Sequence, residues 1–91
     1  MRIIEGTQSA AGFKFAVVVS KYNDFVTDRL QQGALAALEA AGVRSEDITV
    51  VRVPGAFEIP LAARQVADTS QFDGIICLGC LIRGATPHFE Y

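Results

Sequence analysis

The sequence has no long apolar run. None of its stretches approaches the roughly 18 consecutive apolar residues that a helix needs to span a bilayer. The opening MRIIEGTQ lacks the cationic segment and following apolar stretch of a secretory signal. Positive charge is not in excess either. The sequence has 8 Lys and Arg residues and 10 Asp and Glu residues, which gives a net charge of −2 at pH 7. We therefore expect a cytoplasmic protein with no nucleic-acid or membrane partner.

Cysteine is scarce: the sequence contains only Cys77 and Cys80, in a CxxC pattern. Both end an apolar, strand-like run, where a spacing of three places side chains on opposite faces. Three strand residues span roughly 10 Å, whereas the Cα atoms of a disulfide are usually less than ~7 Å apart. No second Cys/His pair is present to complete a zinc site. We predict two small, buried, free thiols.

The sequence is rich in apolar residues, which make up 51% of it, against 20% charged residues. This balance is typical of a globular chain rather than a disordered one. Ninety-one residues make one small domain at most, and neither a repeat nor a low-complexity linker divides it.

The first half of the chain predicts a strand followed by a helix. Residues 13–20, FKFAVVVS, form an apolar, β-branched run that predicts a strand buried on both faces. The helix is expected to be capped by Asn23 or Asp24 and to end at Gly42. Its apolar positions recur at helical spacing: Val26, Leu30, Ala34, Ala37, Leu38 and Ala41.

The second half predicts strands at 47–53 and 73–79 with a helix between them. Pro60 is tolerated only in the first turn of a helix, which places the helix start near Phe57. One apolar face follows helical spacing: Ile59, Ala62, Ala63, Val66 and Ala67.

Strand–helix–strand–helix–strand at this spacing predicts an α/β fold of two βαβ units with a parallel sheet. If the third strand lies beyond the first, one helix covers each face of the sheet. Three strands buried on both sides need more cover, and the third would keep an unpaired edge. We therefore expect residues 1–91 to form a single domain that is incomplete at its C-terminus. The opening MRIIEG predicts an edge strand or an arm that adds to a neighbour's sheet.

Polar and aromatic residues gather where the predicted strands end. Three segments reach the carboxyl edge of the sheet: SKYND (20–24), PGAFE (54–58) and GCLIRGATPH (79–88). Ligands of open α/β sheets bind at this edge, so we expect one site built from all three. The architecture alone names no reaction.

Each candidate residue has two interpretations. The ordinary pKa of His88, near 6.5, suits proton transfer, but a loop histidine also bonds neighbouring carbonyls. Glu58 is a functional carboxylate or a charge favourable at a helix start. Tyr22 stacks on a planar ligand or is an ordinary half-exposed tyrosine. Arg83 steers anions or is solvated, and the amides of residues 84–86 approach an anion only if the loop is suitably folded.

Two long segments carry a family resemblance. VRVPGAFEIP (51–60) and GCLIRGATPHFEY (79–91) resemble the signature segments of lumazine synthase, the penultimate enzyme of riboflavin biosynthesis. SKYND falls where that family has an aromatic-Asn turn, and MRIIEG resembles its N-terminal arm. The similarity extends over essentially the whole chain.

The resemblance implies an activity and a fold. Family members condense 5-amino-6-(D-ribitylamino)uracil with 3,4-dihydroxy-2-butanone 4-phosphate, giving 6,7-dimethyl-8-ribityllumazine, phosphate and water, without a metal or an organic cofactor. The implied fold is a flavodoxin-like three-layer sandwich, of which this chain supplies a βαβαβ portion. The family assembles into pentamers, in some members sixty-subunit shells, with each active site between two subunits.

The resemblance also implies a role for each site residue. Tyr22 stacks on the uracil-type ring, and Glu58 accepts hydrogen bonds from ribityl hydroxyls. His88 moves protons. The ring and ribityl pocket is lined by Ala56, Phe57 and Glu58. The heterocycle is contacted, largely through backbone groups, by Cys80, Leu81 and Ile82. The butanone phosphate is faced by Ala85 and Thr86.

Two departures from the family pattern matter. Tyr22 stands where Phe is more usual. The family also continues well beyond Tyr91, with a phosphate-binding arginine and an aromatic residue that crosses the subunit interface. We therefore expect residues 1–91 alone to be poorly soluble and inactive. A second chain carrying the C-terminal part and riboflavin synthase are candidate partners. The alternatives are a non-catalytic flavin- or lumazine-binding protein and a shell-forming protein of the same fold.

Overall fold

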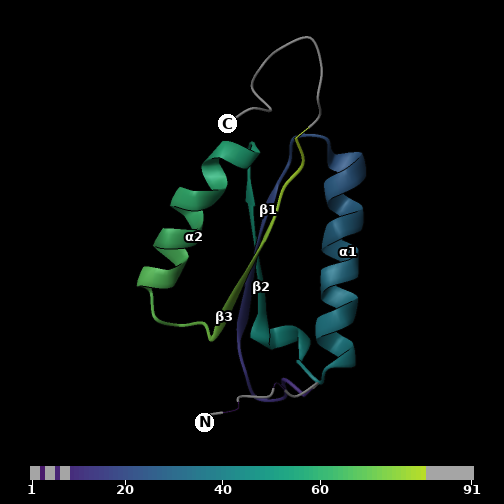
Figure 1. Ribbon diagram of the computed structural model, residues 1–91, viewed down its shortest axis with the longest axis vertical. Coiled ribbons are helices and arrows are strands. Elements are labelled where there is room, and N and C mark those ends of the chain that lie inside the picture. Colours follow the sequence, from purple (N-terminus) through teal and green to yellow (C-terminus); the bar gives the residue numbers. More distant parts are fainter. Residues whose placement is uncertain (1–2, 4–5, 7–8, 82–91) are drawn as a thin grey trace.

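The chain folds as a parallel sheet between two helices (Figure 1). The computed structural model describes residues 3, 6 and 9–81. Among these residues no helix is long and apolar enough to cross a membrane. Short 3₁₀ turns precede β2 and α2, at Ser45–Asp47 and Ala56–Glu58. The elements in order are β1 (Phe15–Ser20), α1 (Asp24–Ala40), β2 (Ile48–Val53), α2 (Ile59–Asp68) and β3 (Gly74–Leu78).

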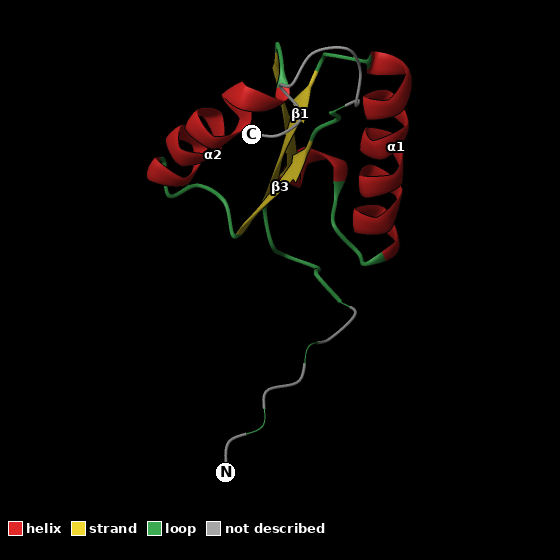
Figure 2. Ribbon diagram, turned by 45° about the horizontal axis from the view of Figure 1, so that its top comes forward, coloured by secondary structure: helices red, strands yellow, loops and turns green. Residues whose placement is uncertain are grey.

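The sheet has the strand order β2-β1-β3, and both pairings are parallel. Phe15 of β1 lies opposite Ile48 of β2 on one side and Gly74 of β3 on the other. The two helices lie on opposite faces of this sheet (Figures 1 and 2). The predicted α/β fold of two βαβ units is thus confirmed, with the third strand beyond the first, as part of a three-layer sandwich.

The core is centred on β1. The side chains of Ala16–Val19 are completely buried, because β1 has a strand on each side and a helix over each face. On the α1 face, Val17 packs in one cluster with Leu38 of α1 and with Val43. The apolar, β-branched run therefore does form a strand buried on both faces, but it begins at Phe15. Phe13 lies before it and is 50% exposed.

The buried face of α1 differs from the predicted one. Leu38 is buried as expected, but Leu30 is 40% exposed and Ala37 is exposed, whereas Thr27 is completely buried. Apolar periodicity missed Thr27 because its residue type is polar. Within the helix its hydroxyl donates to the carbonyl oxygen of Asn23, at 3.4 Å, which offsets the cost of burying it.

The prediction of two buried thiols is wrong, although both cysteines are free. Cys77 is exposed and Cys80 is half-buried. The reason is the incomplete cover that the sequence predicted: β3 is an edge strand among the described residues, and none of its side chains is fully buried. No residue of α2 is fully buried either. The predicted N-terminal arm lies largely outside the described residues.

The end of α1 is fixed by a glycine in the left-handed region. Gly42 has a φ of 96°. Its N–H donates to the carbonyl of Glu39, and the N–H of Val43 donates to the carbonyl of Leu38, both at 3.0 Å. This pair of bonds is the Schellman arrangement, which directs the chain from the helix toward β2.

Two glycine substitutions in this region should change stability in opposite directions. Gly42→Ala should lower the free energy of unfolding by about 1–2 kcal/mol, because a side chain is disfavoured in the left-handed region. Gly33→Ala, in the middle of α1 with open space around the new methyl group, should raise it by up to about 1 kcal/mol. Denaturant unfolding of the protein that carries this chain measures both. Changes of the same sign would contradict this account of the helix end.

Candidate functional site

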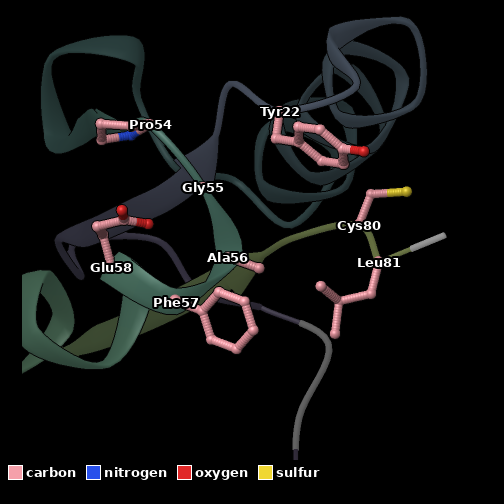
Figure 3. Close-up of a pocket in the computed structure, with 8 residues that line it drawn as sticks. All are labelled: Tyr22, Pro54, Gly55, Ala56, Phe57, Glu58, Cys80 and Leu81. Atoms are coloured by element: carbon pink, nitrogen blue, oxygen red, sulfur yellow. The ribbon is translucent and has the colours of Figure 1, made fainter. Parts of the chain in front are cut away.

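A pocket lies at the carboxyl edge of the sheet, where the segments after β1, β2 and β3 meet (Figure 3). Its volume is about 330 Å³. All three segments predicted to form the site contribute to it. The lining residues are Tyr22, Pro54, Gly55, Ala56, Phe57, Glu58, Cys80 and Leu81.

Backbone hydrogen bonds fix Tyr22 at the rim. The N–H of Lys21 donates to the carbonyl of Val53 at 2.7 Å, and the N–H of Tyr22 donates to the carbonyl of Pro54 at 3.0 Å. These bonds extend the pairing of β1 with β2 beyond the ends of both strands. Tyr22 remains 52% exposed, which leaves ring surface available to a flat ligand.

The turn Ala56–Glu58 forms the opposite wall. Gly55 is extended, and the chain then closes a 3₁₀ turn in which the N–H of Glu58 donates to the carbonyl of Gly55 at 3.2 Å. The helix α2 begins immediately afterwards at Ile59, with Pro60 in its first turn, close to the predicted start. The ring of Phe57 is 57% exposed, a large apolar surface beside the pocket.

Glu58 occupies the cap position of α2 without using its side chain as a cap. Its carboxylate makes no hydrogen bond to the start of the helix. It turns back toward Gly55 instead, where a Cβ atom would lie 3.1 Å from Oε2 (Figure 3). A capping role therefore does not account for this carboxylate, which leaves its oxygens able to accept hydrogen bonds from a ligand.

Asn23 does not line the pocket but contacts a residue that does, a contact that sequence reasoning did not predict. It does precede α1, but its side chain makes no cap hydrogen bond. Its Nδ2 donates instead to Sγ of Cys80 at 3.8 Å, which joins the segment after β1 to the segment after β3. Its φ of 57° is a conformation that few residues other than glycine and asparagine adopt. An asparagine directly after a strand end was therefore the feature of the sequence that could have indicated this conformation.

The remaining predicted site residues lie outside the described residues. They are Ile82, Ala85, Thr86 and His88. Within residues 3, 6 and 9–81, no group of three or more His, Cys, Asp or Glu side chains is arranged to hold a metal ion. The described part of the site thus offers two aromatic rings, one carboxylate and one thiol around an apolar hollow. Such a lining suits a flat ring with a polar substituent.

Comparison with known proteins identifies close relatives. A model of the 6,7-dimethyl-8-ribityllumazine synthase family matches residues 12–91. Curated proteins with that name from Desulfatibacillum aliphaticivorans and Syntrophus aciditrophicus (strain SB) are each 54% identical to the chain, over 90 and 89 residues. The alignments cover 99% and 98% of this chain but 58% of each relative. The chain thus spans somewhat more than half the length of the curated relatives it matches.

The exposed ring of Tyr22 makes a prediction about flat ligands. Tyr22→Ala should weaken the binding of a flat heterocyclic ligand by about 2- to 10-fold, because one aromatic contact contributes about 0.5–1.5 kcal/mol. Tyr22→Phe should leave the affinity unchanged, because stacking uses the ring face and not the hydroxyl. Titration calorimetry measures both. Equal affinities for all three proteins would show that the ring does not contact the ligand.

Proposed function

The chain belongs to the 6,7-dimethyl-8-ribityllumazine synthase family, and we propose that the protein carrying it condenses 5-amino-6-(D-ribitylamino)uracil with 3,4-dihydroxy-2-butanone 4-phosphate. The products are 6,7-dimethyl-8-ribityllumazine, phosphate and water, in the penultimate step of riboflavin biosynthesis. One observation carries the proposal: Tyr22, the turn Ala56–Glu58 and residues Cys80–Leu81 line one pocket, and all of them fall within the segment that matches the family.

The described pocket holds the pyrimidine substrate. The ring of Tyr22 stacks on the flat, electron-rich heterocycle, while Cys80, Leu81 and Ile82 contact its edge through backbone groups. The ribityl chain extends along Ala56 and Phe57 toward Glu58. The carboxylate of Glu58 accepts hydrogen bonds from the ribityl hydroxyls, which are stronger than bonds to a neutral acceptor.

Residues 85–88 serve the second substrate and the proton transfers. Ala85 and Thr86 face the phosphate of the butanone, and small residues there leave backbone amides accessible to an anion. His88 moves protons during imine formation and phosphate elimination, because its ordinary pKa lies near neutrality. These roles rest on the family resemblance of residues 79–91.

Holding two substrates in register supplies a large part of the acceleration. The condensation joins two molecules, so orientation in one site removes much of its entropic cost. The phosphate leaves as a stable anion, and the amine and the ketone of the substrates provide the reacting groups themselves. The protein's residues then have to bind, align and exchange protons.

The protein assembles as a homo-oligomer, either a pentamer or a sixty-subunit shell, with each site completed by a neighbouring subunit. The membership of the chain in the 6,7-dimethyl-8-ribityllumazine synthase family supports assembly. Riboflavin synthase, which consumes the product, is a further candidate partner.

His88 separates an enzyme from a carrier of the same fold. His88→Ala should lower the rate of lumazine formation at saturating substrate by about 100- to 10,000-fold, the usual contribution of a positioned acid–base group. The affinity for the lumazine product should stay within about 2-fold, because stacking on Tyr22 does not depend on His88. Absorbance of the product and equilibrium titration measure the two quantities.

Two results would contradict this assignment. An unchanged rate in the His88→Ala protein would remove the histidine from the mechanism. An unsubstituted protein that binds the lumazine but never forms it would favour a lumazine-binding protein over an enzyme.

Glu58 should act on the ribityl chain alone. Glu58→Gln keeps the shape of the side chain but replaces a charged acceptor with a neutral one. The KM for the ribitylaminouracil should rise about 5-fold, the difference of roughly 1 kcal/mol between the two kinds of hydrogen bond. An analogue with a methyl group in place of the ribityl chain is the control. If its KM rose by the same factor, Glu58 would not be binding the ribityl hydroxyls.

A further inference from the structure

Gly79 lies where the turn that carries Ala56, Phe57 and Glu58 packs against the end of β3. It follows the last residue of that strand and precedes Cys80 of the pocket. A Cβ atom at this position would lie 3.0 Å from Cδ1 of Ile59 and 3.4 Å from Cβ of Ala56. Both distances are at or below ordinary contact between carbon atoms. Cδ1 of Ile59 and Cβ of Ala56 thus crowd the space that a methyl group at position 79 would need.

The requirement for glycine is steric and not conformational. The φ of Gly79 lies outside the left-handed range, unlike that of Gly42. Alanine at position 79 would therefore cause no backbone strain and would add a single methyl group. Any effect of that substitution is the effect of crowding.

The side toward the sheet is already occupied. The same Cβ atom would lie 3.8 Å from Oγ of Ser20, the last residue of β1, whose side chain is completely buried. This hydroxyl finds no hydrogen-bond partner among the described residues. A methyl group cannot satisfy it, and the packed strand behind it cannot move aside. The displacement falls on the side of the turn, first on Cδ1 of Ile59 as the nearest atom and then on Ala56.

Ala56 lines the pocket, whereas Ile59 lies behind it as the first residue of α2. Ala56 opens the 3₁₀ turn and its Cβ atom is fixed to the backbone, so a shift of Ala56 moves Phe57 and Glu58 with it. Cys80 and Leu81 are on the same strand end as Gly79 and form the facing wall. The absence of a side chain at residue 79 therefore sets the separation of the two walls.

We propose that Gly79 is a positioning residue that determines how tightly the pocket binds the ribityl-pyrimidine substrate. This inference rests on the function proposed above. A methyl group at position 79 shifts the turn by a few tenths of an ångström and loosens the fit of the ring and its ribityl chain. The butanone phosphate, whose proposed contacts are Ala85 and Thr86, is not affected. Gly79 itself contacts neither substrate through a side chain.

The test compares Gly79→Ala, Ile59→Val and the double variant in the complete protein. Valine lacks Cδ1, the atom nearest to the added methyl group, so Ile59→Val makes room for it. Gly79→Ala should raise the KM for the ribitylaminouracil by about 10-fold, because displacements smaller than an ångström impair an oriented site. The KM for the butanone phosphate should stay within about 2-fold. The double variant should recover most of the loss.

Two controls separate crowding from general damage. Ile59→Val alone should leave both KM values within about 2-fold, and Gly33→Ala, a methyl group added in open space on α1, should change neither. A general loss of stability would raise both KM values together or lower the amount of folded protein. Only a displaced turn gives a selective effect that valine at position 59 reverses.

Three outcomes would overturn the inference. One is a Gly79→Ala protein with both KM values unchanged. Another is a selective effect that Ile59→Val does not reverse. The third is failure of both alanine-79 variants to fold, which would make the packing a requirement of the whole fold. An unsubstituted protein that forms no lumazine would instead contradict the proposed function, so the two failures are distinguishable.

Discussion

The parallel pairing of β1 with both of its neighbours is the interaction on which the site depends. Ser20 lies opposite Val53, and Val19 lies opposite Leu78, so all three strands end at the same edge of the sheet. Two further backbone hydrogen bonds, from Lys21 and Tyr22 to Val53 and Pro54, carry this alignment into the loops. The bond from Asn23 to Cys80 adds the third segment. The pocket is the space that these fixed strand ends enclose.

Burial of β1 maintains that pairing. Its middle residues are completely inaccessible to water, whereas β2 and β3 at the edges retain exposed side chains. The hydrophobic effect therefore acts most strongly on the strand from which the other two take their register. The two edge strands have weaker support, because each of them pairs with one neighbour only among the described residues.

Much of the fold could be predicted from the sequence, because each helix and strand depends on a pattern of neighbouring residues. The β-branched run of β1, the glycine after α1 and the proline in the first turn of α2 each identified an element to within a few residues. Burial was harder to predict. Thr27 is buried and Cys77 is exposed, against their residue types, because burial depends on which helix covers which strand. Periodicity along one element does not contain that information.

In the site, too, local features could be predicted and contacts between distant residues could not. Tyr22 and the turn at residues 56–58 could be placed at the sheet edge, because the edge is defined by where strands end. The contact of Asn23 with Cys80 and the close approach of Ile59 to Gly79 join residues that are 57 and 20 positions apart, distances across which no sequence pattern extends. Family resemblance supplied the roles of the loop after β3, for which the residues themselves left two interpretations open.

A crystal structure of the complete protein with 6,7-dimethyl-8-ribityllumazine bound tests the central claim most directly. The account predicts the lumazine ring against Tyr22 and its ribityl chain along the turn toward Glu58, with Cys80 and Leu81 on the facing side. A ligand bound elsewhere on the fold, with this pocket empty, would contradict it.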